Sequence, residues 1–171
     1  LILASKEGKA VRFTEDAVNV VSRTARGVRG MRLSETDRIV GVMLADPDKK
    51  VLTITENGYG KRTDIEEYRL QGRAGKGIKA MNLTEKTGKL AAQLLVHDEE
   101  DLLLITIDGT VIRTPVNSIS VLGRNTQGVR VMRVEEGCKV VCVARAEAEE
   151  EEEETAEVVA AEAAEETSSE E

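Results

Sequence analysis

Apolar positions in this 171-residue chain fall into short runs separated by glycine-centred turns. Runs at 1–5, 51–55 and 102–106 each lead into a turn, and a second run follows at 9–13, 59–62 and 110–114. The turns are Glu7-Gly8, Asn57-Gly58 and Asp108-Gly109. Asn-Gly or Asp-Gly between apolar runs favours a tight hairpin, because both central residues of such a turn need positive φ. The pattern therefore predicts three β-hairpins.

A second glycine-centred motif follows each hairpin. It reads GVRGMRL at 27–33, GIKAMNL at 77–83 and GVRVMRV at 128–134, and we call these stretches the Gly-Met segments. An arginine stands four residues before each of their glycines, at Arg23, Arg73 and Arg124. A further apolar run follows at 39–45, 90–96 and 139–144. Each repeat therefore carries four predicted strands, with the Gly-Met segment as the third.

Four strands in about 50 residues is the size of a propeller-like blade, and repeats of this length are typical of radial or stacked arrays. We predict an all-β fold of three four-stranded blades, in repeats of about 1–48, 49–100 and 101–146. Helix is compatible with the sequence only at 16–21. From 147 the chain is rich in Glu and Ala and loses its periodicity. Like charges three and four residues apart oppose a helix there, so 147–171 is predicted to be a disordered acidic tail.

Charge divides the chain in the same place. Of the 32 Asp and Glu residues, 13 lie in 147–171, whereas all 24 Lys and Arg residues precede it, so the body carries +5 while the whole chain carries −8. A basic body joined to an acidic tail favours a nucleic-acid partner. Two interpretations of the tail stay open: a solvated segment, or a mimic of DNA that competes for the basic body.

Cations recur at equivalent positions in the repeats. The candidate DNA-binding residues are Arg12, Arg23, Arg26, Arg29, Arg32, Lys61, Arg62, Arg73, Lys76, Lys79, Arg113, Arg124, Arg130 and Arg133. On blades around an axis they would form a track along the rim, which suits a duplex with one charge per about 1.7 Å of axis. No set of side chains is arranged to read base edges, so we predict backbone contact with bending. The alternative is that these arginines are solvated or paired with acids such as Glu35, Asp37 and Glu66.

Residues with catalytic potential stand alone in the sequence. Tyr68 and His97 have no partner base or metal cluster nearby, and the glycine-rich run at 72–77 lacks the Ser/Thr and helix of a phosphate-binding loop. Cys138 and Cys142 are predicted to be small buried thiols, since no second cysteine pair accompanies them as zinc ligands. Few aromatic residues are available for stacking single-stranded bases. No apolar run approaches the about 20 residues of a membrane span.

Four segments resemble one protein family. QGRAGKG at 71–77 resembles a degenerate copy of the QRRGGKG box found in the A subunit of bacterial DNA gyrase, and GRNTQGV at 123–129 resembles the last-blade segment of that protein. NGYGKRT at 57–63 and EGKAVRF at 7–13 resemble its preceding blades. The resemblance covers residues 1 to about 145, and an acidic tail is also typical of these proteins.

The resemblance implies a β-pinwheel, a propeller-like disc with an altered strand order, of which this chain holds the final three of usually six blades. It implies a domain that binds and bends duplex DNA in support of ATP-dependent negative supercoiling by a type II topoisomerase. The implied partners are DNA, the remainder of the gyrase A subunit and the gyrase B subunit, without a membrane, in the bacterial cytoplasm at the nucleoid. No catalytic residue, metal or cofactor is implied for this segment, because the cleaving tyrosine and the ATP and Mg sites lie elsewhere in the holoenzyme.

Two departures qualify what the family implies. The intact box belongs to a first blade that is missing here, and Gly72 and Ala74 replace its Arg and Gly. We therefore expect weak DNA binding without complete wrapping, from a chain that starts partway through a larger protein. The C-terminal domain of the topoisomerase IV A subunit is one alternative, although the 57–62 and 123–129 segments favour gyrase. A propeller used for protein interaction is another, and the scarcity of aromatic residues speaks against it.

Overall fold

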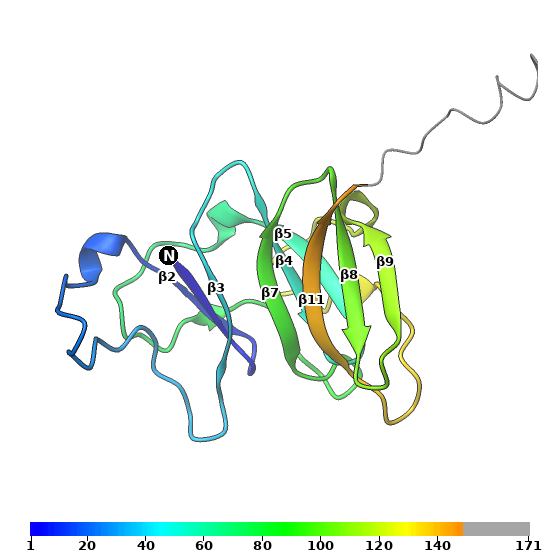
Figure 1. Cartoon of the computed structure of the whole chain (residues 1–171), viewed down its shortest axis with the longest axis horizontal. Coiled ribbons are helices and arrows are strands. Elements are labelled where there is room, and N and C mark those ends of the chain that lie inside the picture. The colour runs from blue at the N-terminus through cyan, green and yellow to red at the C-terminus, as the bar shows by residue number, and fades with distance from the viewer. Residues whose placement is uncertain (149–171) are drawn as a thin grey trace, which may run out of the picture.

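The computed structural model describes residues 1–148, in which antiparallel strands form three sheets set side by side (Figure 1). The strands are β1 (Ile2–Ser5), β2 (Lys9–Arg12), β3 (Ile39–Met43), β4 (Lys50–Thr55), β5 (Tyr59–Asp64), β6 (Ile78–Lys79), β7 (Leu90–Val96), β8 (Glu100–Thr106), β9 (Val111–Pro115), β10 (Val129–Arg130) and β11 (Val140–Glu147). Short 3-10 helices at Glu15–Ala17, Ile65–Glu67 and Val116–Ser118 follow the three hairpins. The all-β prediction is confirmed, and the segment considered for helix at 16–21 forms only the first of these turns.

The three predicted hairpins are confirmed. They pair β1 with β2, β4 with β5, and β8 with β9. Their turn glycines Gly8, Gly58 and Gly109 have φ of +78°, +76° and +88°. The residues before them, Glu7, Asn57 and Asp108, do not have positive φ, so the expectation that both central residues adopt it is wrong and holds for the glycine alone. The acidic tail predicted from 147 lies almost wholly outside the described residues, and β11 continues through Glu147.

Each sheet is assembled across the boundary between repeats. The strand orders are β3-β1-β2-β6, which we call blade 1, β10-β5-β4-β7, blade 2, and β11-β8-β9, blade 3. The short strand β6 comes from the second repeat but pairs with β2 of the first, and β10 comes from the third repeat but pairs with β5 of the second. A blade is therefore completed by the Gly-Met segment of the following repeat.

The prediction that each Gly-Met segment forms the third strand of its own repeat is wrong. The Gly-Met segments at 77–83 and 128–134 form strands of only two residues, and the segment at 27–33 forms none. A strand needs an edge with which to pair, and the described residues contain no earlier hairpin that could receive 27–33. For the same reason the outer edge of β9 has no strand beside it in residues 1–148.

The hydrophobic core lies between blades. One cluster joins Ile2 and Met43 of blade 1 to Val51, Tyr68 and Leu95 of the second repeat. A larger cluster joins blades 2 and 3, and it contains Leu52, Ile54, Val96, Leu102, Leu104, Val116, Ile119, Met132 and Val140. The last strands of the repeats, β3, β7 and β11, lie next to one another in this arrangement (Figure 1). Neighbouring repeats therefore share their apolar surface.

Tyr68 belongs to this core. Its side chain is fully buried, and its hydroxyl accepts a hydrogen bond from Gln93 Nε2 at 3.3 Å. Burial raises the pKa of the Tyr68 hydroxyl to about 12. A structural role in packing the first two blades together explains this residue.

The prediction of two buried thiols is wrong. Cys142 is exposed and Cys138 is half-buried. A register shift between Val140 and Cys142 and the start of β11 at Val140 remove the shared face that their spacing implied. The Cys138 thiol instead donates to Asp108 Oδ1 at 2.7 Å, and together with the hydroxyls of Thr106 and Thr110 it lowers the pKa of Asp108.

The strand exchange predicts different costs for two glycine substitutions. Gly27→Ala should destabilise the chain by about 1 kcal/mol, because φ is +72° but nothing lies within 4 Å of an added Cβ. Gly128→Ala should cost about 3 kcal/mol, because φ is +75° and the Cβ would also lie 2.5 Å from the Gly60 carbonyl oxygen of blade 2. Urea unfolding of the full chain measures both, and equal losses would contradict the tight contact at Gly128.

Candidate nucleic-acid interface

The structure separates the predicted DNA-binding cations by exposure. Exposed are Arg23, Arg26, Arg29, Arg32, Lys76, Lys79, Arg113, Arg130 and Arg133; half-buried are Arg12, Arg73 and Arg124; buried are Lys61 and Arg62. Exposed cations can meet a polyanion at the surface. The half-buried and buried groups instead contact neighbouring repeats, and their DNA contact stays a prediction.

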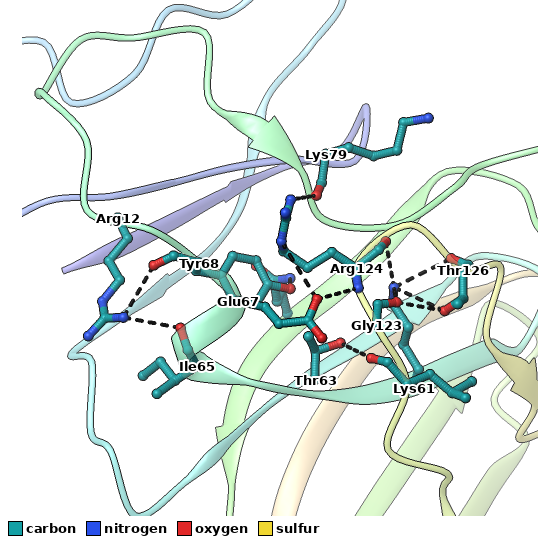
Figure 2. A network of polar contacts seen from close by, with 12 residues as sticks. Arg12, Lys61, Thr63, Ile65, Glu67, Tyr68, Lys79, Gly123, Arg124 and Thr126 are labelled. Carbon is teal, nitrogen blue, oxygen red and sulfur yellow. Dashed lines mark hydrogen bonds and ion pairs between the residues drawn. The ribbon is translucent and has the colours of Figure 1, made fainter.

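Arg12 and Arg62 occupy equivalent positions after the hairpin turns, and each binds the 3-10 helix of the next repeat. Arg12 Nη1 donates to the carbonyl oxygens of Ile65 and Tyr68 at 3.1 and 3.2 Å (Figure 2). Arg62 Nε donates to the Ile119 oxygen at 2.6 Å and Nη2 to the Asn117 oxygen at 3.2 Å. Arg62 also forms an ion pair with Asp98.

The third residue of this set, Arg113, has different partners. Its Nε lies 2.7 Å from Asp101 Oδ2, and its Nη2 donates to the Glu147 carbonyl oxygen at 2.6 Å. Both of these partners belong to blade 3, the blade of Arg113 itself.

Arg73 and Arg124 reach back to the preceding repeat. Arg73 donates from Nε to the Ala17 oxygen at 2.8 Å and from Nη1 to the Arg29 oxygen at 2.5 Å. Arg124 Nη1 donates to the Lys79 oxygen at 2.8 Å, and its Nε lies 3.8 Å from Glu67 Oε2 (Figure 2). Arg23, the first member of this set, is exposed.

Lys61 is buried between the second and third repeats. Its ammonium donates to the carbonyl oxygens of Gly123 and Arg124, both at 2.7 Å, and lies 3.4 Å from the Thr126 oxygen (Figure 2). Desolvation by burial lowers its pKa to about 8, while Glu67 opposes the shift and Arg124 adds to it. Lys61 therefore links the second repeat to the third through hydrogen bonds.

Two of the exposed cations lie where the exchanged strands pair with the hairpins. Lys79 of β6 lies directly opposite Lys9 of β2 in the sheet register. Like charges in this position repel one another, so an anion placed between them would be favoured. At the equivalent place in blade 2, Arg130 of β10 lies opposite Tyr59 of β5.

Tyr59 is held between two cations at this second place. Arg130 Nη2 donates to the Tyr59 hydroxyl at 2.9 Å, and the Arg130 guanidinium and Lys86 ammonium each lie 5.5 Å from the ring centroid. The hydrogen bond from Arg130 lowers the pKa of Tyr59. The ring thus orients two positive charges at the blade edge.

A hollow lies beside each of these pairs. One, of about 550 Å³, is lined in part by Lys9, Lys79 and Lys89. The other, of about 430 Å³, is lined in part by Lys86, Arg130 and Arg133. Acidic side chains also line both hollows, so the cations supply local positive charge rather than a uniformly basic surface.

Sequence reasoning missed some cations here and named acids that do not form the observed pairs. Lys9, Lys86 and Lys89 were not among the candidates, although Lys9 directly follows a turn glycine and so stands at the blade edge. Within residues 1–148, Glu67, Asp98 and Asp101 are acids that pair with candidate arginines. Sequence spacing could not identify these pairs, because Glu67 lies in the repeat before that of Arg124, and Asp98 is 36 residues from Arg62 within one repeat.

The described residues contain neither a metal-binding cluster nor a helix that could span a membrane. Among residues 1–148, no group of three or more His, Cys, Asp or Glu side chains is placed to hold a metal ion. No helix in the same part of the chain has the length and apolar character of a membrane span.

Comparison with known proteins gives one consistent family. The family model described as DNA gyrase C-terminal domain, beta-propeller, matches residues 1–46, 49–95 and 100–143. The DNA gyrase A subunit of Salmonella typhimurium is 43% identical over 145 residues, and that of Staphylococcus epidermidis is 43% identical over 147 residues. Each match covers 85% of this chain but only 16% of the relative, so the chain spans about a sixth of these proteins.

Two solved structures share the fold. A DNA gyrase A C-terminal domain gives a TM-score of 0.77 at 28% identity, covering 84% of this chain and 49% of the other. A DNA topoisomerase IV C-terminal domain gives 0.80 at 26% identity, covering 94% and 50%. The fold is therefore common to both kinds of domain, whereas the family model and the curated relatives are those of gyrase.

The buried lysine predicts a pH dependence of stability. In the folded chain the pKa of Lys61 falls from 10.5 to about 8, so between these values the unfolded chain binds more protons than the folded one. The Lys61 contribution to stability therefore rises with pH across this window. The difference in unfolding free energy between wild type and Lys61→Met should shift in favour of wild type by about 2 kcal/mol from pH 7 to 10.

Urea unfolding at several pH values measures this difference, and Lys76→Met, which removes an exposed ammonium, is the matched control. If the difference in unfolding free energy between wild type and Lys61→Met changed with pH no more than the difference for Lys76→Met, the burial of a charged ammonium would be contradicted.

Proposed function

Because the chain belongs to the DNA gyrase C-terminal domain family of beta-propellers, we propose that it is a DNA-binding and DNA-bending module of a type II topoisomerase. It supports the negative supercoiling that the holoenzyme drives with ATP. The observation that carries this proposal is the exposure of the equivalent cations Arg29, Lys79 and Arg130, one in each Gly-Met segment. A duplex that follows this series meets positive charge once per repeat.

The binding is directed at the phosphate backbone. The exposed candidate cations are arginines and lysines, and the aromatic side chains Phe13, Tyr59 and Tyr68 are all buried. Without exposed rings there is no platform on which unpaired bases could stack. The module therefore binds duplex DNA with little dependence on sequence.

We assign the module to gyrase in preference to topoisomerase IV. The matching family model and the curated relatives at 43% identity are those of gyrase, and this supports the assignment. The proposed partners are duplex DNA, the remainder of the gyrase A subunit and the gyrase B subunit, in the cytoplasm at the nucleoid. The module contributes no catalytic group or cofactor site, and ATP, Mg and the cleavage chemistry belong to the rest of the holoenzyme.

Use of the propeller for protein interaction is the second candidate. Apolar residues are exposed at Val42 in β3 and Leu44 directly after it, and at Ile107 and Val111 around the last hairpin. The anchoring aromatic side chains typical of protein interfaces are buried here. The cation series therefore favours DNA.

Salt dependence of DNA binding tests the proposal. The full chain should bind linear duplex DNA with log K falling against log salt, by about 0.9 for each phosphate neutralised. Arg29→Ala/Lys79→Ala should reduce the slope by about 1.8, because two phosphate contacts are lost. Fluorescence anisotropy at four salt concentrations measures both slopes.

The matched control is Lys49→Ala/Arg145→Ala, which removes the same charge from a hollow lined by residues of β3 and β7. Its slope should stay within about 0.3 of wild type, since non-contacting surface charges add little. A wild-type slope near zero, or equal losses in both variants, would overturn the proposed surface.

A further inference from the structure

The contacts between repeats 1 and 2 recur between repeats 2 and 3. Arg73 donates to the carbonyl oxygen of Arg29, and Arg124 donates to that of Lys79. Arg29 and Lys79 are both the third residue of a Gly-Met segment, so the two bonds are equivalent. Each arginine therefore holds the backbone of a residue whose own side chain is an exposed cation.

A second arginine crosses the same boundary in the opposite direction. Arg12 holds the 3-10 helix of repeat 2 and Arg62 that of repeat 3, in each case through carbonyl oxygens. Every boundary in the described residues is thus crossed by one forward arginine and one backward arginine. Two separated attachment points restrict rotation of one blade against the next, which a single point does not.

Backbone hydrogen bonds accompany these arginines with the same periodicity. Arg32 N donates to the Gly75 oxygen at 2.9 Å, and its equivalent Asn82 N donates to the Thr126 oxygen at 3.0 Å. The arginine side chains therefore add to backbone hydrogen bonds that already join the neighbouring repeats.

We propose that Arg73 and Arg124, with Arg12 and Arg62 opposite them, are positioning residues that clamp the angle between blades and thereby set the bend of the bound duplex. The inference rests on the proposed DNA-binding function. The clamp acts through Arg29 and Lys79, whose side chains contact phosphates while their carbonyls are held. The planar guanidinium of Arg73 spans the Ala17 and Arg29 oxygens at once, which a lysine ammonium cannot reproduce in the same fixed geometry.

Bending and salt dependence together test the clamp. Arg73→Ala/Arg124→Ala should lose at least half of the energy-transfer increase between dyes on the ends of a short duplex at saturating protein. Its salt slope should fall by less than about 0.5, because these arginines neutralise no phosphate. The comparison is Arg29→Ala/Lys79→Ala, which keeps the carbonyl acceptors, removes the same charge, and should lose about 1.8.

Lysine variants separate the clamp from direct phosphate contact. Arg73→Lys/Arg124→Lys keeps both charges, so a direct contact would restore bending to the wild-type value. The clamp predicts that bending stays reduced by at least a third. These variants also decide the matter if the alanine double variant does not fold.

Hydrogen exchange gives a readout that needs no DNA. In Arg73→Ala the amides of Arg32 and Ala74, which bond across the boundary, should exchange at least ten-fold faster, while Leu3 and Val11 in the first hairpin change less than two-fold. Unchanged exchange at Arg32 and Ala74, or a slope loss near 1.8 in the alanine variant, would overturn the clamp. Absence of any salt-dependent binding by wild type would overturn the DNA function instead, and exchange would still judge the clamp.

Discussion

The backbone of one repeat must approach the hairpin of the preceding repeat closely enough to form a β-ladder, and the rest of the structure depends on that approach. At Gly77 an added Cβ would lie 2.6 Å from the Ala10 oxygen, and at Gly128 it would lie 2.5 Å from the Gly60 oxygen. A side chain at either position would separate the strands, so glycine makes the exchange possible. Once the strands meet, Met81 and Met132 are buried and the neighbouring blades share an apolar core.

Close packing of irregular segments between blades explains why so many cations turn inward. The 3-10 helices and the loops before the Gly-Met segments place carbonyl oxygens in contacts from which water is largely excluded, and such oxygens need donors. Arg12, Arg62 and Lys61 supply those donors from the opposite blade. Cations between the repeats therefore hold neighbouring blades together, while the exposed cations remain available to a polyanion.

Local chemistry made the hairpins and the all-β class predictable. Asn57-Gly58 and Asp108-Gly109 favour a tight turn, and in both turns the glycine has positive φ while the residue before it does not. The destination of the Gly-Met segments was not predictable from the residues alone, because pairing between β2 and β6 joins positions far apart in the chain. The candidate cations differ in burial even where they occupy equivalent positions in the repeat, and the sequence period could not predict this difference. Arg62 and Arg113 share one place in the repeat, yet of these two only Arg62 is followed, within the described residues, by a blade whose 3-10 helix it binds.

Strand exchange also imposes an order on the maturation of the chain as it leaves the ribosome. The β1–β2 hairpin can close early, but its sheet stays incomplete until Ile78 and Lys79 have been synthesised. At about 5–20 residues per second, that edge waits on the order of several seconds. During this interval it offers unpaired amides and carbonyls to other nascent chains. Blades 1 and 2 are each completed by a strand of the following repeat. A chain whose synthesis stops early in the second repeat therefore leaves both blade 1 and blade 2 incomplete.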